Sequence, residues 1–309
     1  MNKIIVTGGA GFIGSHLVDA LVDLGHEVIV IDDFSTGNIK NLKKNKDKIK
    51  ILRQTLSLKS KFLKKIPNVL SKTSIIYHLA ALPRIERSIV DPIGTHDSNV
   101  NGTLAVLELA RKLKVKRFIY ISSSSIYGNQ KILPLKESLT PNPQNPYAVQ
   151  KLFGEYYSKL YAGIYKIPVV ILRLFNVYGP RMFSKGSYKL VFNKWLEQIE
   201  NNIPLTIFGS GKQTRDFTYI SDIIDGLIKG MGLDQKIIYE TINLGGGRQV
   251  SVNYLAKLFN HPIQYYPGRK YEEKFKQADI SKAKKMLKWK PKVSIEEGVQ
   301  KVINFYKYH

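Results

Sequence analysis

The chain lacks cysteine, long apolar runs and clustered metal ligands. None of its 309 residues is Cys, which excludes disulfides, cysteine-ligated zinc and a thiol nucleophile. No apolar run in the sequence approaches the roughly 20 residues that a membrane span requires. The chain begins directly with a strand pattern, so we expect a cytoplasmic protein with no membrane partner and no metal site.

Acidic residues are also scarce. Asp and Glu total 24 against 48 Lys and Arg, which gives a formal net charge of +24. The lysines concentrate in residues 40–65 and 270–292, and a basic surface of this kind favours nucleic acid. However, Asn, Asp and Glu separate them, without the arginine and aromatic residues that line a single-strand groove. We interpret them as a solvated surface and expect no nucleic acid partner; a nucleic-acid-associated protein is an alternative that only the charge suggests.

The N-terminus holds the most specific local pattern. A buried-strand pattern over residues 4–7 leads into Gly8, Gly11 and Gly14, and residues 15–24 have helical periodicity. Glycines let a pyrophosphate approach the backbone, and the N-terminus of the next helix attracts the anion. A second strand pattern ends in Asp32, which suits a ribose hydroxyl. The GxxGxxG spacing in this context predicts a dinucleotide site rather than an ordinary strand–helix turn.

Strand and helix patterns alternate along the first half of the chain. Strand patterns follow at 49–53, 74–79, 117–122 and 168–174, with helical patterns between them, as at 99–113 and 147–165. This alternation predicts an α/β fold with a doubly wound parallel Rossmann sheet. Ligands of such a sheet bind at the carboxyl ends of the strands. We therefore expect the chemistry at residues 78–81, 122–125 and 175–178.

The composition changes after residue 178. A loop rich in Gly, Pro and Ser precedes a helical pattern at 190–201 and a strand pattern at 205–208, and residues 214–233 resemble another strand and helix. We predict a dinucleotide-binding domain over residues 1–178, to which 214–246 return. A smaller mixed α/β substrate-binding domain is expected from 179–213 and 247–309.

One helical pattern places a phenol and an ammonium four residues apart. Tyr147 and Lys151 fall on one face of a predicted helix. Tyrosine ordinarily has a pKa near 10, and an adjacent cation stabilises the phenolate so that it can act as a base. The hydroxyls of Ser122 to Ser125, at the end of a buried strand, are candidates to bind the substrate oxygen. The alternative is a surface pair, since YxxxK is common in helices.

Together these motifs resemble the extended short-chain dehydrogenase/reductase family, specifically its nucleotide-sugar 4-epimerases. The resemblance covers nearly the whole chain and is carried by TGGAGFIGSH at 7–16, HLAA at 78–81, NVNGT at 99–103, SSSSIYG at 122–128, PYAVQK at 146–151, RLFNVYGPR at 173–181, QTRDFTYISD at 213–222 and ADISKA at 278–283.

The resemblance implies an activity and a set of residues. It implies NAD-dependent 4-epimerisation of a nucleoside-diphosphate hexose, through a 4-keto intermediate, with UDP-glucose and UDP-galactose or their N-acetyl forms as substrates. The implied catalytic residues are Ser123, Tyr147 and Lys151. The implied NAD-binding residues are Gly8, Gly11, Phe12, Ile13, Gly14, Asp32, Asp33, Phe34, Ser35, Leu56, Leu79, Ala80, Ala81, Asn99, Tyr147, Lys151 and Phe175. The implied substrate-binding residues are Ser123, Tyr147, Asn176, Phe208, Arg215, Arg269 and Glu272. The carboxylates at 32 and 33 favour NAD over NADP. The resemblance also implies a homodimer that packs through the helices near 100–112 and 148–164.

Alternatives within and outside the family remain. The 4,6-dehydratases carry an Asp-Glu pair where this chain has Ser124 and Ser125, and the decarboxylases carry a glutamate where it has Ser125. These serines count against both activities. A reductase or a different epimerase of nucleotide sugars, and a non-catalytic NAD-binding regulator, are the other interpretations.

Three positions depart from the family pattern. Thr55 stands where an acid usually contacts adenine, and Tyr271 replaces a glycine. Lys276 occupies the position associated with the size of the sugar pocket. We expect its flexible side chain to reach solvent, which would leave room for N-acetyl sugars.

Overall fold

A seven-stranded parallel sheet forms the centre of the protein. The computed structural model describes residues 1–182, 191–268 and 275–308. The strand order is β11-β6-β5-β4-β1-β2-β3, and every neighbouring pair is parallel. The strands are β1 (Lys3–Thr7), β2 (Glu27–Asp32), β3 (Ile49–Arg53), β4 (Ile75–His78), β5 (Arg117–Ser123), β6 (Val169–Leu174) and β11 (Tyr239–Leu244). The predicted doubly wound α/β sheet is confirmed.

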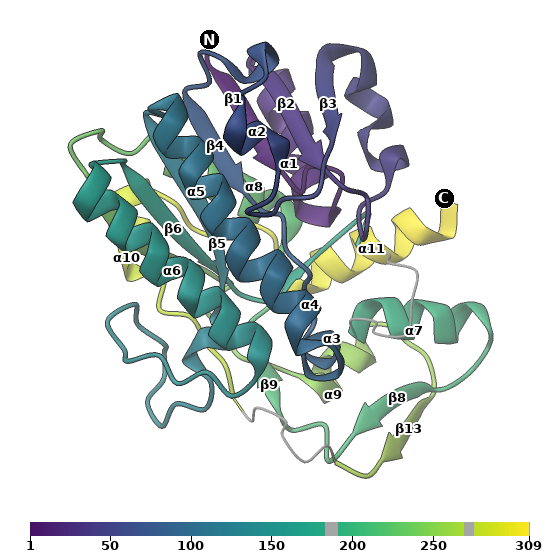
Figure 1. Cartoon of the computed structure of the whole chain (residues 1–309). Helices are drawn as coiled ribbons and strands as arrows, with labels where there is room; N and C mark the ends of the chain where they lie inside the picture. The colour runs from purple at the N-terminus through teal and green to yellow at the C-terminus, as the bar shows by residue number, and fades with distance from the viewer. Residues whose placement is uncertain (183–190, 269–274, 309) are drawn as a thin grey trace.

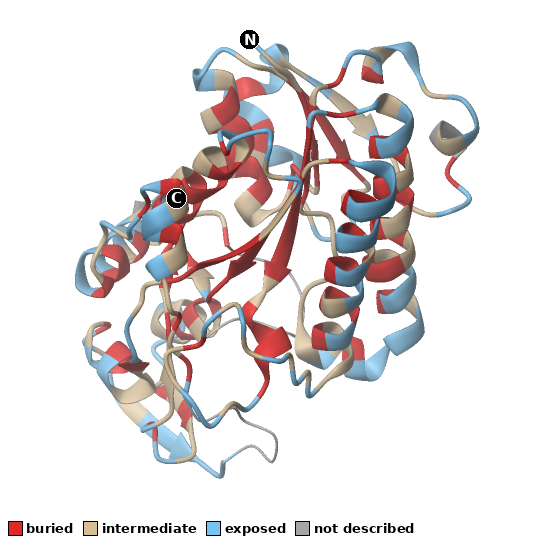
Figure 2. Cartoon of the chain, turned by 90° about the vertical axis from the view of Figure 1, so that its left-hand side faces the viewer, coloured by how far each residue is buried: buried red, intermediate tan, exposed pale blue. Residues whose placement is uncertain are grey.

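Helices cover both faces of this sheet (Figures 1 and 2). Successive strand residues point to opposite faces, so Ile4 and Val6 pack in one apolar cluster and Ile5 in another. The first cluster includes residues of α1 (Phe12–Asp23) and α8 (Ile220–Met231), and the second includes residues of α5 (Gly102–Leu113) and α6 (Pro146–Tyr165). Burial on both faces explains the continuous apolar strand patterns.

Shorter elements complete the sheet side of the molecule. They are η1 (Ile39–Lys48), α2 (Lys61–Lys64), η2 (Asn68–Leu70), α3 (Ile85–Val90), α4 (Pro92–His96), η3 (Asp97–Asn101) and η4 (Ser124–Tyr127).

Most of the rest of the chain packs at the carboxyl ends of the strands (Figure 1), whereas α10 (Ser281–Leu287) packs beside the sheet against β11 and α8. Besides α10, this part of the chain contains β7 (Val177–Tyr178), α7 (Val191–Glu200), β8 (Leu205–Phe208), β9 (Thr214–Arg215), β10 (Thr218–Tyr219), β12 (Val250–Ser251), α9 (Val252–Lys257), β13 (Ile263–Tyr266) and α11 (Ile295–Tyr308). Strand β8 pairs with β13, and β9 with β12. One apolar cluster runs from the sheet to Trp195 and Phe259, so the two parts share a core. The division into two domains stays a prediction.

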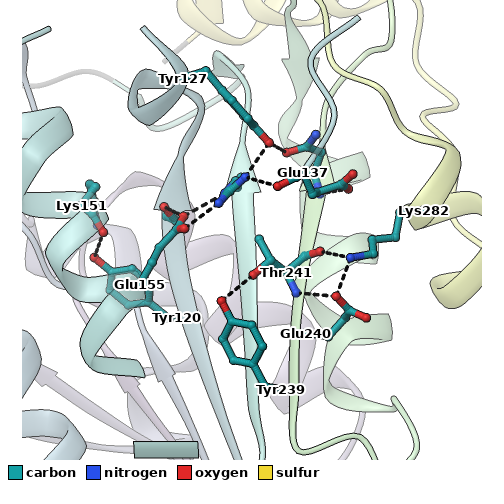
Figure 3. A network of polar contacts seen from close by, with 12 residues as sticks. Tyr120, Tyr127, Glu137, Lys151, Glu155, Tyr239, Glu240, Thr241 and Lys282 are labelled. Atoms are coloured by element: carbon teal, nitrogen blue, oxygen red, sulfur yellow. Dashed lines mark hydrogen bonds and ion pairs between the residues drawn. The ribbon is translucent and has the colours of Figure 1, made fainter. Parts of the chain in front are cut away.

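A buried ion pair joins the sheet to α6 (Figure 3). Arg173 of β6 donates to both carboxylate oxygens of Glu155, at 2.9 and 2.7 Å, and Ser122 donates to the same carboxylate at 2.5 Å. The guanidinium also donates to the Tyr127 hydroxyl at 2.8 Å, which in turn donates to Asn243 of β11. Burial disfavours the charge of Arg173, but the hydrogen bonds and charge of Glu155 outweigh burial and raise the pKa of Arg173.

Glu155→Ala should therefore destabilise the protein strongly. Removing one partner of a buried pair leaves an uncompensated charge and costs about 3–5 kcal/mol, measured as the loss in free energy of unfolding by urea denaturation. Glu297→Ala is the matched control, because its pair with Lys301 is about half exposed and should contribute at most about 0.5 kcal/mol. Equal losses in the two variants would contradict the structural role assigned to Arg173 and Glu155.

Candidate active site

A cavity of about 620 Å³ opens at the carboxyl ends of β1, β2, β4, β5 and β6. It continues to residues of α7 and β8, so its walls come from both the sheet and the smaller elements beside it. This is the edge at which ligands of open parallel sheets bind.

The glycine turn forms one wall of the cavity. Gly8 has φ +69°, and a Cβ there would lie 2.7 Å from the backbone nitrogen of Ala80. A Cβ on Gly14 would lie 2.1 Å from the carbonyl oxygen of Gly8. No side chain caps the N-terminus of α1, which begins after Gly11, so its first turn is suited to an anion.

Asp32 ends β2 beside this turn. Its carboxylate is buried and accepts 2.8 Å hydrogen bonds from the backbone N–H groups of Ala10 and Phe34. Burial raises the pKa of Asp32, and these two hydrogen bonds oppose the rise. Asp33 also lines the cavity and accepts from the backbone N–H of Ser35. Two adjacent carboxylates at this wall would repel a 2′-phosphate.

Most of the residues that the sequence assigned to the cofactor line the cavity. They are Gly8, Gly11, Phe12, Ile13, Gly14, Asp32, Asp33, Ser35, Leu56, Leu79, Ala80, Ala81, Tyr147 and Lys151. Thr55, which departs from the family pattern, lines it as well.

Three assigned residues, Phe34, Asn99 and Phe175, do not line the cavity. The ring of Phe34 packs under the guanidinium of Arg53, 5.7 Å away, and Phe175 is fully buried beside Tyr127. Asn99 instead binds the loop that follows β4. Its side chain accepts from the N–H of Leu82 and donates to the carbonyl oxygen of Leu82.

Tyr147 and Lys151 stand on the first two turns of α6. Asn145 caps this helix by accepting from the N–H of Ala148, and Pro146 occupies the first position, where a proline is preorganised for a helix. The N–H of Tyr147 donates to Ser88 Oγ at 3.0 Å, which ties α6 to α3. Both side chains line the cavity.

Burial sets the protonation of this pair. It lowers the pKa of Lys151 to about 8, against an opposing effect of Glu155; the ammonium donates to the carbonyl oxygen of Ile121 at 2.9 Å. Burial raises the pKa of Tyr147, and the Ser123 hydroxyl and the charge of Arg84 oppose that rise. A positive charge placed near the phenol therefore favours the phenolate.

Ser123 brings a hydroxyl to the same cavity from the end of β5. Its Oγ accepts from the N–H and the hydroxyl of Ser125, at 3.2 and 2.9 Å. The sheet and α6 thus bring together the three residues predicted to be catalytic.

The residues predicted to bind substrate fall into two groups. Asn176, Phe208 and Arg215 line the cavity, and Asn176 donates to the carbonyl oxygen of Asp216. Arg269 and Glu272, like Tyr271, lie outside the described residues.

The expectation that Lys276 reaches solvent is wrong. Its side chain is only 3% exposed, lines the cavity and donates to the carbonyl oxygen of Ser124 at 3.0 Å. Sequence reasoning also missed Arg84 and Arg181, which line the cavity. Arg84 follows the HLAA motif at 78–81, and its position just after a strand end could have indicated that it lines the ligand site.

Comparisons with known proteins identify the family. Residues 4–245 match the model described as the NAD dependent epimerase/dehydratase family. The chain belongs to this family. A UDP-glucuronate 4-epimerase from Thermodesulfobacterium geofontis is 35% identical, covering 99% of this chain and 97% of its own.

Solved structures agree with this assignment. The UDP-glucose 4-epimerase of Thermotoga maritima, solved with UDP-glucose, has a TM-score of 0.92 and 34% identity over 100% of this chain and 99% of its own. The UDP-glucuronic acid 4-epimerase of Bacillus cereus, solved with UDP-glucuronic acid and NAD, has a TM-score of 0.88 and 35% identity over 99% of both. The resemblance to the nucleotide-sugar 4-epimerases among the extended short-chain dehydrogenases/reductases is confirmed.

NAD is the cofactor of this epimerase family member, and the chain fits it. The close backbone contacts at Gly8 and Gly14 exclude a Cβ and hold the turn against the N-terminus of α1, where free N–H groups suit a pyrophosphate. The Asp32 carboxylate suits a ribose. Within residues 1–182, 191–268 and 275–308, no three His, Asp or Glu side chains are grouped to hold a metal ion. In the same residues no helix has the length and apolar character needed to cross a membrane.

Gly14→Ala should abolish NAD retention. The new methyl group would meet the Gly8 carbonyl, and overpacking of this kind typically costs about 1–3 kcal/mol. Thermal unfolding and the NAD released from denatured protein measure both effects. Gly232→Ala is the control: the nearest atom to its added Cβ is the Lys229 carbonyl oxygen at 3.6 Å, an ordinary contact, and its φ is −82°. Stability should rise by about 0.4–1 kcal/mol with NAD retained. Normal NAD content in Gly14→Ala would show that the turn does not hold the cofactor.

Proposed function

We propose that this enzyme interconverts the C4 epimers of a nucleoside-diphosphate hexose through a 4-keto intermediate, with UDP-glucose and UDP-galactose, or their N-acetyl forms, as the parent pairs. One observation carries the proposal: Ser123, Tyr147 and Lys151 line the same cavity as the glycine turn and Asp32. The serines at 124 and 125 supply no carboxylate there, which favours epimerisation over elimination of water or loss of carbon dioxide.

Tyr147 is the proposed acid and base. Its phenolate oxygen takes the proton of the C4 hydroxyl and returns it at the end of the cycle. The Lys151 ammonium, fixed by the Ile121 carbonyl, stabilises that phenolate. Ser123 would hydrogen-bond the C4 oxygen while its charge changes. Bound NAD supplies the hydride acceptor and, after the sugar has turned, the hydride donor.

The far part of the cavity is proposed to hold the nucleotide end of the substrate. Arg215 and Asn176 line this region together with Phe208. A guanidinium suits phosphate oxygens, and an aromatic ring can lie against a base. Holding the diphosphate firmly leaves the sugar ring free to turn about its phosphate linkage and present its other face.

A second copy of the chain is the proposed partner. Five apolar side chains of α6 are 37–65% exposed, namely Val149, Phe153, Tyr156, Leu160 and Ile164. Their spacing places them on one side of the helix, opposite the buried Lys151 and Glu155. Such a stripe favours burial against the same helix and α5 of a second molecule.

The test of catalysis uses purified protein without added cofactor. UDP-glucose and UDP-galactose should interconvert, because the cycle regenerates NAD⁺. Tyr147→Phe should keep its fold and NAD but lose about 10²–10⁴-fold in kcat, since the ring remains and the proton-transferring oxygen is gone. Tyr165→Phe, on the same helix outside the cavity, should keep full activity. Near-normal turnover by Tyr147→Phe would refute the proposed mechanism.

Leu160→Asp tests the dimer. A carboxylate in the apolar stripe would be desolvated on association, so light scattering after gel filtration should report a monomer. Ile132→Asp, at a side chain 66% exposed in a loop, should leave the oligomeric state as in the parent protein. If both variants behave as the parent does, the stripe is not the interface.

A further inference from the structure

Arg84 is an unusual residue at the cavity wall. Its backbone has φ 104° and ψ 123°, a conformation that L side chains rarely adopt. Non-glycine residues persist in such strained conformations mainly at functional sites. The side chain lines the cavity, yet the guanidinium has no hydrogen bond or ion pair with any residue among 1–182, 191–268 and 275–308.

The segment that carries Arg84 is fixed to the catalytic helix. Before Arg84 in the chain, the backbone N–H and carbonyl of Leu82 both hydrogen-bond to the Asn99 side chain. After Arg84, the Ser88 hydroxyl donates to the Ile85 carbonyl at 2.7 Å and accepts from the N–H of Tyr147 at 3.0 Å. The segment that holds Arg84 is therefore bonded to α6 at Tyr147, both side chains line the same cavity, and the charge of Arg84 acts on the Tyr147 phenol.

A second cation reaches the same region from a distant part of the chain. Lys276 is 3% exposed, and its ammonium donates to the carbonyl of Ser124 at 3.0 Å, next to the catalytic Ser123. Among the residues that the structure describes, the acids that line the cavity are Asp32, Asp33 and Glu86. The first two stand at the end of β2, beside the glycine turn, and Glu86, whose charge acts on Arg84, is exposed. Arg84 and Lys276 thus bring two cations to the part of the cavity that holds Tyr147 and Ser123.

The location of these cations decides which anion they suit. Tyr147 acts at C4, which lies across the pyranose ring from the C1 that bears the diphosphate. A cation beside Tyr147 consequently faces substituents of the ring near C4, such as the group at C6. A carboxylate at that position would give Arg84 a planar partner for two parallel hydrogen bonds.

We propose that Arg84 and Lys276 form a subsite for a carboxylate on the sugar ring, so that the preferred substrate is a nucleoside-diphosphate uronic acid rather than a neutral hexose. This inference rests on the proposed 4-epimerase function. Arg84 binds the carboxylate directly, and Lys276 attracts it through its charge. The family contains a structure with UDP-glucuronic acid bound, so its fold accommodates such a ring.

The test compares kcat/KM for UDP-glucuronate and UDP-glucose. The parent protein should prefer UDP-glucuronate at least about tenfold, and Arg84→Met should lower that preference by about 10–100-fold, the effect of losing a hydrogen bond to a charged group. Lys276→Met should lower it by a smaller factor. Arg87→Met is the matched control, because Arg87 lies in α3, the short helix that follows Arg84, and does not line the cavity. The substrate preference of this variant should equal that of the parent protein.

Two results would overturn the inference: a parent protein that prefers UDP-glucose, or an unchanged preference in Arg84→Met. Failure of the proposed function is distinct, because then neither the acidic nor the neutral sugar nucleotide is epimerised. Arg84→Gly separates a binding role from a purely structural one. Glycine adopts positive φ without strain, so this variant should have a higher Tm and a collapsed preference for UDP-glucuronate. A lower Tm with the preference retained would mean that Arg84 serves folding alone.

Discussion

The buried ion pair between Arg173 and Glu155 is the interaction on which the arrangement of the site depends. It joins β6 to α6, while Ser122 of β5 donates to the same carboxylate. Lys151 stands one turn before Glu155, and its ammonium binds the Ile121 carbonyl. A buried pair of this kind contributes little net stability compared with apolar packing. Its value here is geometric, because it fixes the rotation and height of α6 against the sheet and so places Tyr147 beside Ser123.

The parallel sheet explains why residues far apart in sequence meet in one cavity. All seven strands run in the same direction, so every strand ends at the same edge. The glycine turn after β1, Asp32 at the end of β2, Ser123 at the end of β5 and Asn176 after β6 are therefore neighbours without any direct link between their segments. The two faces are used for burial by helices, which leaves this edge as the place where backbone amides and polar side chains can reach a ligand.

The sequence predicted what depends on local patterns and failed where distant contacts decide. Apolar runs located six of the seven strands of the sheet to within about a residue, because burial on both faces leaves a clear pattern. The seventh, β11 (Tyr239–Leu244), was not predicted as a strand. The orientation of Lys276 was wrong because its partner is the carbonyl of Ser124, 152 residues away, and no local pattern reports that contact. The amide of Asn99, a residue that the resemblance assigned to the cofactor, bonds to the backbone of Leu82 and so shapes the loop that faces the cavity, another contact that no local pattern reports. The positive φ of Arg84 could not be predicted either, because glycine is the residue that indicates such a conformation in a sequence and arginine does not.

Charge near the catalytic phenol links the mechanism to substrate choice. In the proposed mechanism Tyr147 acts as a base at neutral pH and needs a cation beside it. Lys151 would provide that cation, and burial lowers its pKa to about 8. Each further cation near the phenol makes the phenolate easier to form, but it also makes Lys151 harder to keep protonated, because like charges repel. An anionic substituent on the substrate would relieve that repulsion when it binds. In the proposed subsite, Arg84 and Lys276 add positive charge near Tyr147, so binding of an acidic sugar would couple recognition of the ring to the chemistry at C4.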